Sequence, residues 1–232
     1  MRNADVAALV WVSALLGTLA FAQQPGQHPH EHHAQQGVAQ SMAPGQMHHG
    51  AHMTYTPERK PTDEDRRRAE QIVRTLRTAL ERYKDYRVAI GDGYQPFLPN
   101  VPLPEHHFTN YRLGFEAAFR FDPARPTSLL YKRLGDGWEL VGAMYTAPQR
   151  FTLEQLNERV PLSIARWHQH VNICLPQPGQ GAQADWTKFG PQGSIATREA
   201  CEAEGGRFFP VLFGWMVHVY PWAESPELVW RH

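Results

Sequence analysis

The stretch from Arg166 to Cys174, RWHQHVNIC, contains the side chains of this sequence best suited to chemistry. Side chains alternate between the two faces of an extended strand. One face is therefore expected to carry His168, His170, Asn172 and Cys174. Two imidazoles on one face can bind the same metal ion, and histidine is the commonest metal ligand in proteins. The motif predicts a metal-binding strand, although a hydrogen-bonded polar strand has the same pattern.

A second candidate strand, GWMVHVYPW, contributes one more histidine, His218, which shares a face with Met216 and Tyr220. Because His218 stands alone in an apolar and aromatic run, we expect it to be buried and to need partners for its ring nitrogens. A metal ion on one nitrogen and an oxygen acceptor on the other would meet that need, as would two hydrogen bonds in a core. If the two strands pair, His168, His170 and His218 form a three-histidine site. Such a ligand set leaves an open position on zinc, copper or iron.

The proline-rich stretch YQPFLPNVPLPEHHFTN is expected to be a loop that brings Glu105, His106 and His107 to the same region. A loop with two adjacent histidines is expected to direct only one inward, and we prefer His107 as a fourth metal ligand. Glu105 or Glu199 is a candidate base, or an acceptor behind a ligand. Nothing in the sequence chooses between these two carboxylates.

The start of the chain predicts export to the periplasm or the medium. Arg2 precedes an apolar run over residues 6–19, and Ala20-Phe21-Ala22 matches a cleavage site, so residues 1–22 are expected to be a signal peptide. An uncleaved anchor is the alternative. No later segment is long and apolar enough to span a bilayer, so we expect no stable membrane insertion after cleavage.

Export changes the interpretation of the two cysteines, because the compartment is expected to be oxidising. Cys174 and Cys201 are expected to form a disulfide, which would stabilise the fold by about 3 to 4 kcal/mol for a loop of about 27 residues. Cys174 could instead complete a copper site with the histidines. The two roles exclude each other in the oxidised protein.

Residues 23–60 are rich in Gln, Gly, Pro and His and are expected to be disordered, because they contain too few large apolar side chains to offset the ordering entropy. Imidazole with thioether suits copper in either oxidation state, while imidazole alone also suits zinc and nickel. This segment is thus expected to concentrate metal weakly, unless it is only a linker of drifted composition. Its candidate ligands are His28, His30, His32, His33, His48, His49, His52, Met42, Met47 and Met53.

Residues 61–232 are expected to form a single α+β domain on a mainly antiparallel sheet, with a long N-terminal helix and several short helices. The expected elements are a helix over 62–90, a hairpin with strands 129–133 and 138–145, a helix over 153–159, a strand over 166–175 and a helix from 197. Residues 208–222 are expected to form a last strand, or two strands with a bend at Gly214. The formal charge is zero and no long basic run occurs, which argues against nucleic acid as a partner.

Four stretches, HHFTN, FDPARPTSLLYKRLGDGWELVGAMYTAP, WHQHVNIC and FGWMVHVYPW, resemble a group of uncharacterised exported bacterial proteins with a domain of unknown function. The resemblance covers roughly residues 65 to 222. It implies an exported bacterial protein with one domain and carries no implication for its chemistry.

These observations favour an exported metal-binding protein that acts in periplasmic metal handling. Copper is the preferred ion, with zinc or iron as alternatives, and the expected ligands are His168, His170, His218 and His107. A second hypothesis is a secreted metal-dependent hydrolase or oxidoreductase with an open three-histidine site, so the sequence leaves enzymatic activity undecided. A third is a disulfide-stapled structural or interaction domain without metal. The first two hypotheses require the strand of His168 to pair with the strand of His218.

Overall fold

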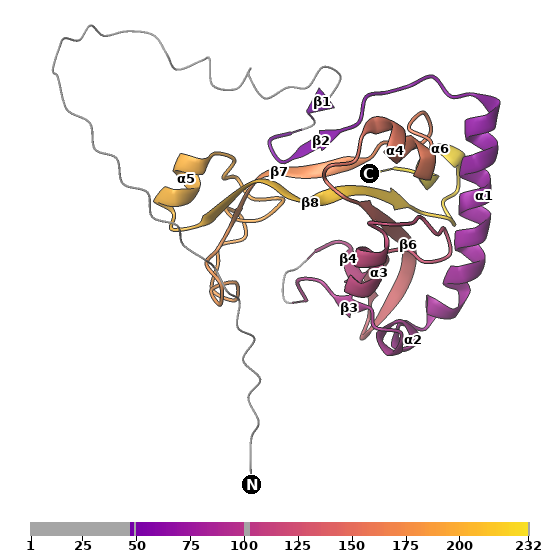
Figure 1. Ribbon diagram of the computed structural model, residues 1–232. Helices are drawn as coiled ribbons and strands as arrows, with labels where there is room; N and C mark the ends of the chain where they lie inside the picture. The colour runs from indigo at the N-terminus through magenta and orange to yellow at the C-terminus, as the bar shows by residue number, and fades with distance from the viewer. Residues whose placement is uncertain (1–46, 49, 100–102, 232) are drawn as a thin grey trace, which may run out of the picture. The chain divides into compact units, whose positions relative to one another are not determined.

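The computed structural model describes residues 47–48, 50–99 and 103–231, and it has the predicted α+β architecture with an antiparallel sheet. The sheet has eight strands in the order β1-β2-β7-β8-β6-β5-β4-β3 (Figure 1). The strands are β1 Met47–His48, β2 Met53–Tyr55, β3 Gln95–Pro96, β4 His106–Thr109, β5 Ser128–Leu134, β6 Gly137–Ala147, β7 His168–Leu175 and β8 Arg207–Val219. The helices are α1 Asp63–Leu80, η1 Glu81–Lys84 (a 3-10 helix), α2 Tyr86–Gly91, α3 Tyr111–Glu116, α4 Leu153–Arg159, α5 Arg198–Ala203 and α6 Pro226–Val229.

The pairing on which the predicted site depends is present in the sheet. Strand β7 lies antiparallel to β8, with His168 directly opposite Met216. On its other side, β8 pairs antiparallel with β6, and Met144 of β6 is opposite His218. The predicted hairpin is also confirmed, because β5 and β6 pair through the turn at Gly135, whose φ of 56° favours glycine.

Helix α1 begins where the sequence predicted and ends earlier. Thr62 and Asp65 form a capping box, in which the Thr62 side chain accepts from the Asp65 amide and the Asp65 side chain accepts from the Thr62 amide. The expected continuous helix to residue 90 is wrong, because Asp85 is extended at φ −86° and ψ 104° and caps a new helix, α2. Its side chain accepts from the Arg87 amide, and this competes with continuation of the preceding turn.

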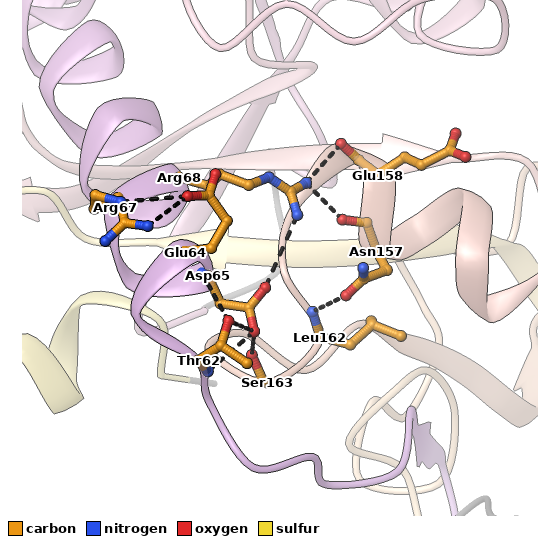
Figure 2. Close-up of polar contacts among 9 residues, drawn as sticks. All are labelled: Thr62, Glu64, Asp65, Arg67, Arg68, Asn157, Glu158, Leu162 and Ser163. Carbon is orange, nitrogen blue, oxygen red and sulfur yellow. Dashed lines mark hydrogen bonds and ion pairs between the residues drawn. The ribbon is translucent and has the colours of Figure 1, made fainter.

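Polar contacts join the first turns of α1 to the end of α4 (Figure 2). Asp65 Oδ2 accepts a hydrogen bond from the Ser163 hydroxyl at 2.9 Å. Arg68 Nη2 donates to the carbonyls of Asn157 at 2.8 Å and Glu158 at 2.9 Å, which are among the carbonyls that a helix end leaves without helical partners. These contacts hold α1 and α4 together at one end of the domain.

The sheet has an apolar core on one face and a smaller cluster on the other. Residues on α1, including Leu76 and Leu80, share the main core with residues from β5, β6, β8 and the segment around α4. Figure 1 shows α1 upright at the right of the view, across the direction in which β7 and β8 run. Leu130, Met144 and Met216 form the smaller cluster, with Val141 and Tyr220 packed against it. Adjacent residues such as Leu129 and Leu130 belong to different clusters, as the alternation along a strand requires.

The predicted disulfide between Cys174 and Cys201 is confirmed. Both sulfurs are buried, and Phe189 and Ile195 pack beside them in a core of their own. This bond closes the loop between β7 and α5 onto the end of β7. Within the described residues, no helix combines the length and apolar character needed to cross a membrane.

The ordered domain begins before residue 61, where the sequence analysis placed its start. Strand β2 pairs with β7, so that Met53 is opposite His170 and Tyr55 is opposite His168. The amide of Thr56 continues this pairing by donating to Trp167 O at 2.8 Å. Strand β2 pairs on both sides, with β1 and with β7, so backbone hydrogen bonds order this segment although it has few large apolar side chains. The predicted signal peptide over 1–22 and the expected disordered residues 23–46 lie outside the described residues.

Candidate metal site

The side chains of His107 and His218 meet on the face of the sheet opposite the main core. Their Nε2 atoms are 3.2 Å apart, and their ring centroids are 5.2 Å apart. The register of the strands explains the meeting, because His107 is opposite Leu130 on β5 and His218 is opposite Met144 on β6. Two nitrogens bound to one tetrahedral ion at about 2.0–2.1 Å would be about 3.3 Å apart. The pair can therefore share a hydrogen bond, or it can bind one metal ion.

His168 and His170 lie next to this pair. His168 is fully buried, and its ring centroid is 5.2 Å from that of His218. The ring of His170 is half-buried and lies 5.6 Å from that of His168. The fold thus brings all four histidines predicted as ligands to one region of the sheet. In the described part of the chain, however, no group of three or more His, Cys, Asp and Glu side chains is arranged to hold a metal ion.

The pairing of β7 with β8 is irregular between His168 and His170. The register shifts at this point, and Phe213 on β8 has a left-handed φ of 69°. Asn172 also has a left-handed φ, 55°, while the register from His170 to Leu175 is regular. Cys174 lies in the core around the disulfide, and its bond to Cys201 removes its sulfur from the ligand set in the oxidised protein.

His106 and His107 project to opposite faces, because they belong to strand β4 and not to the expected loop. His106 is buried against Trp138, with the two rings at 4.9 Å in an edge-to-face arrangement. This burial lowers the pKa of His106. His107 is the member of the pair that lies against His218, in line with the preference for His107.

One carboxylate lies close to the histidines. The Tyr220 hydroxyl donates to Glu105 Oε1 at 3.0 Å, and the Tyr220 ring is 6.4 Å from the ring of His218. Burial raises the pKa of Glu105 and also raises that of Tyr220. Glu199, the other carboxylate considered from the sequence, is exposed on α5. The fold therefore selects Glu105 as the carboxylate near the candidate site.

Two further contributors to this region were missed by sequence reasoning. The Tyr55 ring centroid is 5.8 Å from that of His168, because β2 borders β7. Met144 occupies the position directly opposite His218 on β6. A period of two along each strand shows which residues share a face, but the register between distant strands is not visible in the sequence.

Hydrogen bonds of the His52 side chain hold the start of β2 beside β7, next to the candidate site. His52 Nδ1 is 3.0 Å from the carbonyl of Asn172, and its Nε2 is 2.6 Å from the carbonyl of Gly193. The His52 carbonyl in turn accepts from the amide of Val171 at 3.0 Å. These contacts tie the start of β2 both to β7 and to the loop closed by the disulfide.

Comparison with known proteins adds no relative from which a function could be transferred. No protein family, no curated protein and no solved structure matches this chain.

Proposed function

We propose that this protein binds a copper ion outside the cytoplasm and acts in metal handling. The observation that carries the proposal is the 3.2 Å separation of His107 Nε2 and His218 Nε2, together with the buried ring of His168 at 5.2 Å from His218. These distances are close to those of imidazoles that share one tetrahedral ion. Zinc and iron remain the alternative ions, since imidazole binds all three.

The surroundings support metal binding over a purely structural cluster of imidazoles. His107 is opposite Leu130, His168 is opposite Met216 and His218 is opposite Met144, so the three rings share a sheet face with the apolar cluster of Leu130, Met144 and Met216. The close pair His107 and His218 already lies at a separation suited to one ion, which lowers the entropic cost of binding through these two side chains. His170, at the next position along β7, is the fourth proposed ligand or a support for His168.

Two observations support a role outside the cytoplasm. The Cys174–Cys201 disulfide is typical of exported proteins, because cytosolic thiols are kept reduced. The first 22 residues have the composition of a signal peptide. We propose that the histidines and methionines between residues 28 and 53 capture metal weakly and raise its local concentration near the site on the sheet.

The test removes two imidazoles from the site or two from the N-terminal segment of the full chain. We expect the double variant His107→Asn/His218→Gln to lose the tightest equivalent of Cu(I) and Zn(II), measured by competition with a chromophoric chelator for each ion. The matched control His32→Ser/His33→Ser should keep that equivalent. Equal affinities for the wild type and the His107/His218 variant, with unchanged circular dichroism, would overturn the proposal.

The hydrogen-bonded Glu105 and Tyr220 favour a second candidate, a metal-dependent enzyme, because they place a proton-transfer group near His218. Such an enzyme needs an open coordination position. Azide added to the Cu(II)-loaded protein should then change its electron paramagnetic resonance spectrum. An unchanged spectrum would favour binding and transport over catalysis.

A further inference from the structure

The methionines of the folded domain stand opposite its histidines. Residues 50–232 contain three methionines, Met53, Met144 and Met216. Each is the direct cross-strand partner of a histidine: Met53 of His170, Met144 of His218 and Met216 of His168. Directly opposite residues have Cβ atoms about 4.5–5.5 Å apart, well within the reach of a methionine side chain.

Two of these methionines surround the close pair of imidazoles. Met144 is opposite His218, and Met216 precedes His218 by two residues on the same face of β8. Both side chains are almost fully buried, with exposed fractions of 6% and 5%, and they pack against each other and Leu130 in one cluster. Their sulfurs are therefore held on the histidine face and shielded from solvent.

Imidazole and thioether together define a type of metal site. Thioether sulfur is a soft ligand that selects Cu(I), whereas zinc prefers imidazole, thiolate and carboxylate. All the donors in this set are neutral, and a monovalent ion is less costly than a divalent one to hold in a low-dielectric site without an anionic ligand.

We propose that Met144 and Met216 are thioether ligands which, with His107 and His218, make the site selective for Cu(I). This inference rests on the proposed metal-binding function and specifies its ion and oxidation state. His168, opposite Met216, is the adjacent imidazole that completes or supports this set. Met53 and His170 form the next pair toward the edge of the sheet. They could bind an ion transiently as it passes from the N-terminal segment to the site.

The alternative is that these methionines only fill the cluster with Leu130. The double variant Met144→Leu/Met216→Leu distinguishes the two, because leucine has a similar volume and is well tolerated at buried methionine positions. We expect its Cu(I) affinity, measured anaerobically with ascorbate and a chromophoric chelator, to fall by about 10- to 100-fold. Its Zn(II) affinity should stay within about twofold, since zinc would not use the sulfurs.

The matched control is Met42→Leu/Met47→Leu, which removes the same number of thioethers from the N-terminal segment and should leave the Cu(I) affinity of the site unchanged. X-ray absorption of the Cu(I)-loaded full chain should show copper–sulfur scattering that the Met144/Met216 variant loses. Unchanged Cu(I) affinity in that variant would overturn the thioether assignment alone, provided that the His107/His218 variant loses binding. Retention of Cu(I) and Zn(II) by the His107/His218 variant would overturn the proposed function itself.

Discussion

His107 Nε2 and His218 Nε2 are 3.2 Å apart, although 111 positions separate the two residues in the chain. Neither residue lies next to the other in the sheet, because β5 and β6 stand between their strands β4 and β8. The two imidazole side chains therefore meet across the two strands between them, on the face that also carries Leu130 and Met144. The contact with His218 distinguishes His107 from His106, its neighbour in the sequence.

Replacement of either His106 or His107 by alanine should show that one supports the stability of the fold and the other supports metal binding. His107→Ala should weaken metal binding with little loss of stability, since its ring is only partly buried. His106→Ala should lower the free energy of unfolding by about 1–3 kcal/mol through lost packing on Trp138, and it should leave metal affinity intact. Urea unfolding and metal titration of both variants test this. If His106→Ala weakened metal binding and His107→Ala lowered stability, the two faces of β4 would be the reverse of those described.

Removal of the disulfide should lower stability and leave metal binding at the proposed site unchanged. Cys174→Ala/Cys201→Ala is expected to lower the free energy of unfolding by about 3 kcal/mol for a loop of this length. Because Cys174 lies in its own core and not with the histidines, Cu(I) affinity should remain. Denaturant titration and Cu(I) competition measure the two quantities. If the variant lost Cu(I) binding but remained folded, Cys174 would have to be considered a copper ligand.

Gly206 should be required for disulfide formation. A Cβ at this position would lie 2.5 Å from Cys174 Sγ and 2.9 Å from Cys201 Sγ, which is too close for any real contact. We expect Gly206→Ala to leave a larger fraction of free thiol, measured by thiol labelling of the unfolded protein. Gly181→Ala, in the loop between β7 and α5, is the control, because its Cβ would meet only Trp186 at an ordinary 3.8 Å.

The N-terminal boundary of the stable domain can be located by truncation. A chain that starts at residue 50 retains β2, and it should melt close to the full-length protein. A chain that starts at residue 61 loses β2 and His52, exposes the edge of β7 and should melt at a lower temperature and aggregate more readily. Thermal unfolding and light scattering compare the two. Equal behaviour would show that β2 contributes nothing to the fold.

Acid should weaken the junction between α1 and α4 through Asp65. Hydrogen bonds from the side chain and backbone of Thr62 lower the pKa of Asp65, and a further one from Ser163 acts in the same direction. The folded-state pKa is thus below the unfolded one. The contribution to stability is full above about pH 4 and is lost as the pH falls through the lower folded value.

The variant Asp65→Asn should therefore be less stable than the wild type near neutral pH, and the difference should shrink below about pH 4. Asp63→Asn removes a charge from the same helical turn and serves as the control for the helix dipole. Urea unfolding at several pH values gives the comparison. A difference that is constant with pH would exclude the ionised Asp65 as its source.

Much of the local structure follows from the sequence by itself. The capping residues Thr62 and Thr152, the turn at Gly135 and the two-residue period of β5 each depend on neighbouring residues only. For the same reason the helix α4 and the hairpin lie where they were predicted. The cysteine pair was also predictable, because a chain with two cysteines has only one intrachain pairing.

Other features depend on contacts between distant segments, and the tertiary structure alone decided them. The break between α1 and α2, the register shift near His170 and the pairing of β2 with β7 arise where a local preference competes with packing or with an open sheet edge. The candidate site is of this kind. Strand periodicity assigned His168 and His218 to faces, but only the register across four strands brought His107 to His218 and set Met144 beside them. Register is determined by the summed packing of the whole sheet, which no single stretch of sequence encodes.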